Sequence, residues 1–232
     1  SNDLSLEMSS MDCHIWIKNT SSLNEEQFLN CHEKYGKALI VLGDSHAMNF
    51  FNIVSYTGSY PFILAVADGG CRPYRNFNNE NCHYLNFEKF LKKYNKFIDL
   101  ITFHQSGSYF IVDNKGFVDS DLAFQGEFAG FDIKGIKFVK EYLEHIVIDH
   151  GIKTIWVGPF LEYRREPENL LASKDNYKVN QNSISLFRAL DPVIEGIVNK
   201  SKLTKYFTFE YFFWEPQDAI YDDCFVFRDK DH

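Results

Sequence analysis

Two short segments, far apart in the chain, contain side chains that can do chemistry together. Gly43-Asp44-Ser45-His46 offers a serine hydroxyl, and Asp229 and His232 stand three residues apart near the end of the sequence. Serine is a weak nucleophile at neutral pH, so it needs a base that accepts its proton and a group that fixes the tautomer of that base. These residue types predict Ser45 as nucleophile, His232 as general base and then general acid, and Asp229 as the orienting carboxylate.

The residues around Ser45 support this interpretation. An apolar run, 38–42, stops at Gly43, and a helical pattern begins at Ala47. A strand, tight turn and helix in this order hold a serine at the carboxyl edge of a sheet, where the first N–H groups of the helix face any developing negative charge. An ordinary turn with Asp44 or Ser45 as helix N-cap is the alternative. The Asp229 and His232 pair favours the catalytic interpretation.

Strands and helices alternate along the whole chain. The patterns predict strands at 38–42, 61–67, 97–103, 153–157 and 205–209, and helices at 24–35, 46–57, 86–94, 133–150 and 180–199. Such alternation requires a mostly parallel sheet covered by helices on both faces. We therefore predict an α/β fold, a three-layer α/β/α sandwich of flavodoxin-like type with about five strands. Residues 1–36 are predicted as an N-terminal extension packed on a domain at 37–232, with an insertion or lid at 108–131.

The predicted topology brings several polar segments to one edge of the sheet. Ser45, Gly70, His104 and the turn from Asp229 to His232 all fall at predicted carboxyl ends of strands or in the loops that follow them, where ligands bind in open α/β sheets. This shared position predicts a single site.

Composition narrows the class of partner. The formal net charge is −8 with no basic block, which argues against a nucleic-acid partner, and an aromatic share of 17% argues against a disordered chain. No apolar run reaches the roughly 18 to 20 residues that a membrane span needs. Because the sequence begins at Ser1 and stops at a predicted catalytic residue, we expect it to be part of a longer protein, with any membrane segment lying elsewhere.

The spacing of the five cysteines indicates the redox state of the compartment in which the protein works. The short separations of Cys13 from Cys31 and of Cys71 from Cys82 suggest two local disulfides and an oxidising compartment such as the periplasm, with Cys224 left over. Three of the cysteines are followed by histidine, which raises zinc binding as an alternative. Adjacent side chains diverge, however, and no Cys-x-x-Cys spacing supports a zinc site. No metal or cofactor is predicted.

The two chemical segments resemble those of the SGNH hydrolase superfamily, whose first block is Gly-Asp-Ser and whose last block is Asp-x-x-His. The resemblance implies that the amides of Ser45 and Gly70 belong to an oxyanion hole, with Gly69 as the alternative glycine. The third block of the superfamily, Gly-x-Asn-Asp, is missing. Its position holds His104 and Gln105, and either residue is a candidate for the absent oxyanion donor.

A particular branch is indicated by further residues. His46 after the serine, Gly70-Cys71-Arg72-Pro73 before a second cysteine, and Val157-Gly158-Pro159 resemble the periplasmic SGNH domains fused to bacterial membrane acyltransferases of family 3. The resemblance implies an O-acyltransferase, with acetyl as the expected acyl group, for a surface or envelope polysaccharide such as lipopolysaccharide. The acyl donor would be relayed by a membrane domain.

Substrate contacts and alternatives complete the prediction. His46 and Trp214 are the expected substrate contacts, and the aromatic residues at 211–214 form either a sugar-stacking platform or core. Two other functions stay open: a carbohydrate esterase, in which water takes the acyl group, and a non-catalytic glycan-binding domain of the same fold.

Overall fold

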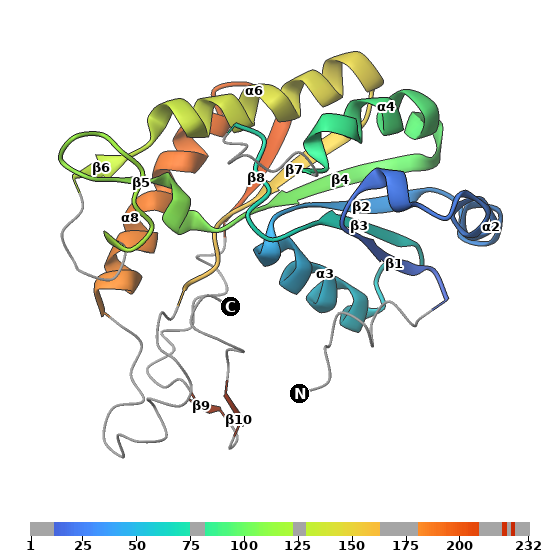
Figure 1. The fold of residues 1–232 in the computed structure, drawn as a ribbon, viewed down its shortest axis with the longest axis horizontal. Coiled ribbons are helices and arrows are strands. Elements are labelled where there is room, and N and C mark those ends of the chain that lie inside the picture. Colours follow the sequence, from blue (N-terminus) through green and yellow to red (C-terminus); the bar gives the residue numbers. More distant parts are fainter. Residues whose placement is uncertain are drawn as a thin grey trace. The chain divides into compact units, whose positions relative to one another are not determined.

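Six parallel strands form the main sheet, in the order β1-β3-β2-β4-β7-β8 (Figure 1). In chain order they are β1 (His14–Ile17), β2 (Ala38–Gly43), β3 (Ile63–Ala67), β4 (Ile98–His104), β7 (Lys153–Val157) and β8 (Thr204–Phe207). This computed structural model describes residues 12–74, 82–122, 129–162 and 181–208, together with the short strands β9 (Ile220–Tyr221) and β10 (Cys224–Phe225).

The chain divides into two compact units. Unit 1 comprises Ser1–Gln105, Lys137–Val157 and Val198–Phe207, and it contains the whole six-stranded sheet. Unit 2 comprises Ser106–Ile136, Gly158–Ile197 and Thr208–His232. The described residues of the predicted insertion at 108–131 belong to unit 2.

Helices cover both faces of the sheet in unit 1. They are α2 (Glu25–Tyr35), α3 (Ser45–Thr57), α4 (Tyr84–Tyr94) and most of α6 (Ile133–His150), with the 3₁₀ turns η1 (Thr20–Ser22) and η2 (Asn95–Phe97). Figure 1 shows α3 on one side of the sheet and α4 and α6 on the other. The predicted three-layer, mostly parallel α/β fold is therefore confirmed.

Local chemistry fixes the ends of these helices. Asn24 caps α2, since its side chain accepts a hydrogen bond from the N–H of Gln27. Asp44 caps α3 in the same way, accepting from the N–H of His46, and Gly58 ends α3 in the left-handed conformation with φ of 63°. The helix starts directly after strand β2, so the chain between them is a single residue, Asp44.

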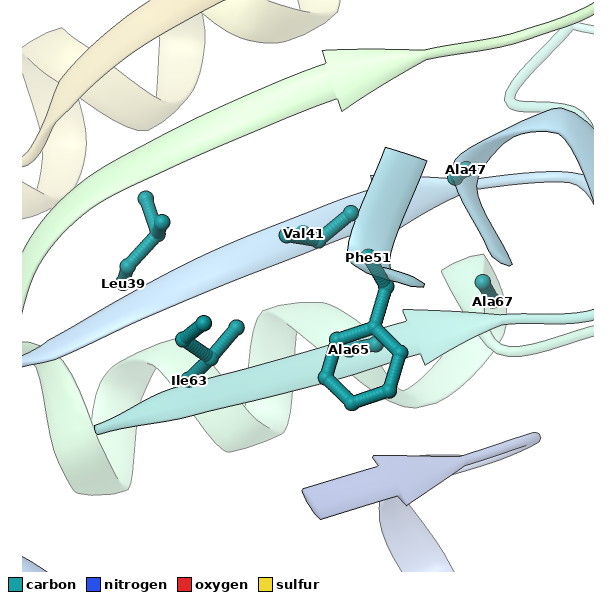
Figure 2. Close-up of a cluster of buried hydrophobic side chains, with 7 residues drawn as sticks. All are labelled: Leu39, Val41, Ala47, Phe51, Ile63, Ala65 and Ala67. Carbon is teal, nitrogen blue, oxygen red and sulfur yellow. The ribbon is translucent and has the colours of Figure 1, made fainter. Parts of the chain in front are cut away.

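The core between the sheet and α3 is built from alternate strand residues (Figure 2). Leu39 and Val41 of β2 and Ile63, Ala65 and Ala67 of β3 pack with Ala47 and Phe51 of α3. The intervening residues Ile40, Leu42, Leu64 and Val66 are also fully buried. Both faces of the central strands are therefore covered, as a parallel sheet requires.

The sheet has one strand more than the predicted five or so. Strand β1 lies at the edge and pairs in parallel with β3, with His14 opposite Ile63 and Ile17 opposite Val66. The indole N–H of Trp16 donates to the carbonyl of Ala67 at 3.0 Å. Part of the predicted N-terminal extension, residues 14–17, is thus an edge strand of the main sheet.

Unit 2 has its own small core. Ile111, Leu161, Leu186 and Phe187 are buried together, on the elements β5 (Ile111–Val112) and α8 (Gln181–Val198) and the segment between them. Strand β5 pairs antiparallel with β6 (Gly130–Phe131), after the 3₁₀ turn η3 (Gly107–Phe110). Strands β9 and β10 form a second antiparallel pair.

A buried carboxylate also belongs to unit 2. Glu162 accepts hydrogen bonds from the Ser106 hydroxyl at 2.6 Å and from the Ser108 N–H at 3.1 Å.

In the part of the chain that the structure describes, no helix is both long enough and apolar enough to cross a bilayer.

Candidate functional site

The predicted nucleophile sits at the end of a central strand. Strand β2 ends at Gly43, Asp44 forms the turn, and Ser45 is the first residue of α3. Ser45 is half-buried, whereas Asp44 and His46 on either side are buried. The first N–H groups of a helix have no partner within the helix and carry a partial positive charge. The N–H of His46 is bonded to the Asp44 side chain and that of Ala47 to the Asp44 carbonyl, so the Ser45 N–H is the candidate donor for an anion beside this hydroxyl.

Gly43 is required by the packing of neighbouring strands. It lies opposite His104 of β4 on one side and Ala67 of β3 on the other. A Cβ atom at position 43 would lie 1.8 Å from the carbonyl oxygen of His104, far closer than any real contact. The first glycine of the predicted block is thus explained by the close approach of β4 to the nucleophile turn.

The glycines after β3 differ in conformation. Gly70 has φ of 76°, which favours glycine, whereas Gly69 lies outside that region. The N–H of Gly69 donates to the Asp68 side chain at 3.0 Å. Because Gly43 and Ala67 pair in register, these glycines follow the strand end beside the nucleophile turn.

A buried ion pair involves the residue before Ser45, and sequence reasoning missed it. Arg72 Nη2 lies 3.2 Å from Asp44 Oδ2, and the two side chains are 4% and 0% exposed. Asp44 Oδ1 accepts the N–H of His46 at 2.9 Å, and Arg72 Nη1 donates to the Gly70 carbonyl at 3.3 Å. The arginine stands 28 positions from Asp44 in the sequence, so no local pattern indicates the pair.

Burial perturbs the titratable groups around this ion pair. It lowers the pKa of His83 to about 4, and the Lys18 backbone and the Asp44 charge only partly oppose this shift. Burial, together with the charge of Asp44, also raises the pKa of Tyr84 well above its usual value. His83 is therefore neutral at pH 7. The ring of Tyr84 packs edge-on against that of Tyr142, with the ring centroids 5.5 Å apart.

Both predicted disulfides are present. Cys13 pairs with Cys31 and Cys71 pairs with Cys82, with Cα atoms 5.6 and 5.5 Å apart. These bonds occupy four of the five cysteines, so the zinc hypothesis built on the Cys-His pairs is wrong. The described residues contain no group of three or more metal-ligating side chains. The second disulfide joins the residue before Arg72 to the residue before His83.

His104 and Gln105 occupy the place of the missing third block, and both are buried. The Nδ1 of His104 lies 3.1 Å from the Val157 carbonyl, which can only accept, so Nδ1 carries the proton. In the neutral ring Nε2 is then an acceptor. Neither polar atom of the Gln105 side chain has a hydrogen-bond partner among the described residues, although the residue is only 2% exposed.

The remaining predicted residues divide into one that is placed and three that are not. His46 is buried, and its ring lies 6.1 Å from that of His104. Asp229, His232 and Trp214 lie outside the described residues. A cavity of about 320 Å³, lined by residues around Cys13 and Cys31, contains none of the predicted site residues.

The fold and the nucleophile turn together define a class of protein, the SGNH-type α/β domains. A family model for the SGNH domain fused to AT3 domains matches residues 12–232, and the chain belongs to this family. No curated protein matches the chain significantly.

Two solved structures are similar to this chain. One, from Streptococcus pneumonia, is described as a candidate platelet activating factor and has a TM-score of 0.47 at 10% identity, covering 90% of this chain and 87% of that one. The other is described as a carbohydrate acetylesterase family member from Sinorhizobium meliloti. Its TM-score is 0.42 at 13% identity, covering 74% of this chain and 82% of that one.

Proposed function

We propose that this chain is a serine-dependent O-acyltransferase domain, with acetyl as the transferred group, that modifies a bacterial surface or envelope polysaccharide through an acyl-serine intermediate. One observation carries the proposal: Ser45 begins helix α3 at the end of a central parallel strand in a family whose SGNH domains are fused to AT3 domains. The AT3 domain is the proposed source of the acyl group, and a carbohydrate hydroxyl is the proposed acceptor.

The proposed chemistry is a double displacement at an acyl carbon. Ser45 Oγ attacks the carbonyl carbon of an acyl ester while its proton passes to the ring of His232, which Asp229 orients. The carbonyl electron pair moves to oxygen and forms an oxyanion. When that oxyanion collapses, the bond to the leaving oxygen breaks and the imidazolium returns the proton to it. The acceptor hydroxyl then attacks the acyl-serine by the same steps, which frees Ser45.

Three donors are proposed for the oxyanion. The amides of Ser45 and Gly70 are the first two, and the positive φ of Gly70 and the engaged N–H of Gly69 favour Gly70 over Gly69. The side chain of Gln105 is the third. An amide N–H₂ always donates, whereas the Nδ1–H of His104 is directed at the Val157 carbonyl. A buried amide without a partner is costly, and an oxyanion would supply the acceptor that the Gln105 side chain lacks among the described residues.

The proposed location is the periplasm. Two disulfides fit an oxidising compartment, and fusion to an AT3 domain fits attachment to the inner membrane. In this arrangement the domain would receive its acyl group at the membrane surface and pass it to a polysaccharide outside the cytoplasm.

The test is turnover of an acetyl ester, such as p-nitrophenyl acetate, by the wild-type chain and by Ser45→Ala. We expect the variant to lose at least about 10³-fold in kcat and to form no acetyl adduct by intact-mass measurement. Ser55→Ala is the matched control. Ser55 lies in the same helix, and its hydroxyl has no partner among the described residues, so its removal should leave activity unchanged.

Two results would separate the competing functions. Equal turnover by wild type and Ser45→Ala would rule out the serine mechanism and favour a glycan-binding domain. If wild type forms the acetyl adduct but releases acetate only to water, even with oligosaccharide acceptors present, the domain is an esterase.

A further inference from the structure

Arg72 links the two backbone segments that the proposed function assigns to the oxyanion hole. One of its terminal nitrogens pairs with Asp44, the residue before the nucleophile, at 3.2 Å, and the other donates to the Gly70 carbonyl at 3.3 Å. Asp44 in turn accepts the N–H of His46. One rigid guanidinium therefore contacts both the nucleophile turn and the glycine loop, and it can hold them at a fixed separation.

The negative charge of Asp44 gives the contact with Arg72 an electrostatic role in addition to its structural one. A carboxylate that is 0% exposed sits one residue before Ser45, at the helix end where an oxyanion would form. Two negative charges so close in a buried setting repel strongly, since a low effective dielectric weakens the interaction little. An uncompensated Asp44 would therefore oppose the very charge that the reaction develops.

Arg72 supplies the compensating charge. It is 4% exposed and cannot lose its proton at any physiological pH. His83, which also experiences the Asp44 charge, is neutral above its pKa of about 4 and does not share this role. The position of Arg72 is itself fixed, because the neighbouring Cys71 is bonded to Cys82 at the start of α4.

We propose that Arg72 is a positioning residue for acyl transfer: it orients the nucleophile turn and the Gly70 loop, and it neutralises Asp44 so that the oxyanion can form. This inference rests on the proposed serine mechanism. It predicts a defect in the chemical step, hence in kcat, with little change in KM, because the ground-state ester carries no oxyanion.

The test compares Arg72→Gln, Asp44→Asn/Arg72→Gln and, as a matched loss of one exposed charge, Lys89→Gln on α4. Asparagine at position 44 keeps a side-chain oxygen for the His46 N–H but carries no charge. We expect Arg72→Gln to lose about 10²-fold in kcat with KM within about threefold, the scale of losing one oxyanion-stabilising group. The double variant should recover at least about tenfold over Arg72→Gln, and Lys89→Gln should match wild type.

Recovery of kcat in the double variant is the decisive result when both variants are folded. A role limited to joining the turn and the loop predicts no recovery, because the double variant also lacks the guanidinium that contacts both segments. Melting curves first establish which variants are folded at the assay temperature. If Arg72→Gln alone is unfolded, the double variant decides: a kcat within about tenfold of wild type supports the proposal.

Three results would overturn it. The first is a folded Arg72→Gln variant with wild-type kcat. The second is a folded double variant that is no faster than Arg72→Gln. The third applies where Arg72→Gln is unfolded, and it is a folded double variant as slow as Ser45→Ala. Failure of the proposed function looks different. In that case wild type itself shows no turnover, or Ser45→Ala is as active as wild type, and this inference falls with the mechanism.

Discussion

Lowering the pH should destabilise this domain through His83, a buried histidine at the start of α4. Burial lowers its pKa from 6.5 to about 4. Between these two values the unfolded chain binds a proton at this residue and the folded chain does not. The free energy of unfolding therefore falls as the pH falls through this window, and the contribution of His83 stops changing below pH 4. A pKa difference of this size corresponds to about 3 kcal/mol.

Equilibrium urea unfolding at several pH values between 7.5 and 4.5 measures this contribution. Wild type should lose about 2 to 3 kcal/mol more over this range than His83→Gln, which cannot titrate at position 83. NMR of the histidine rings gives an independent reading, since the His83 ring should stay neutral at pH 5. If the two proteins lose stability in parallel, or if the His83 ring titrates near 6.5, the assignment of a buried, neutral imidazole is refuted.

Two further predictions concern residues that follow or end the central strands. Gly43→Ala should lower the free energy of unfolding by at least about 2 kcal/mol in urea titrations and reduce acetyl ester turnover, because its Cβ would meet the His104 carbonyl at 1.8 Å. The same change at the exposed helical Gly196, with nothing within 4 Å, should instead stabilise by about 0.5 to 1 kcal/mol, and equal effects at both sites would contradict the packing argument. Gln105→Met keeps the side-chain volume but removes the buried amide, so kcat should fall about 10²- to 10³-fold while the melting temperature holds or rises. A lower melting temperature with unchanged kcat would assign Gln105 a structural role.

Much of the fold follows from local sequence patterns. Helix α6 spans Ile133–His150 and strand β7 spans Lys153–Val157, both as predicted, because their periodicity runs over the whole element and Gly151 separates them. Strand β1 was missed for the opposite reason. It has only four residues, and its partner lies 49 positions further along the chain, as the pairing of His14 with Ile63 shows.

The candidate site likewise has features that a local sequence pattern predicts and features that it does not. The position of Ser45 at a strand end follows from an apolar run that stops at glycine, a pattern within ten residues. The contact between Arg72 and Asp44 and the approach of His104 to Gly43 depend on how three strands align. Single-sequence patterns do not contain such alignments, so the electrostatic surroundings of Ser45 became visible only in the structure.

The all-parallel sheet also affects how the domain folds. Each neighbouring pair among the six strands runs parallel. No pair in this sheet is therefore joined by a tight hairpin that could form early in folding. Gly43 must meet a residue 61 positions away before β2 and β4 align. Closing long segments before any pairing is gained makes such topologies slow to form. The newly synthesised chain would therefore remain incompletely folded, and open to aggregation and proteolysis, for longer than a helical domain of similar size.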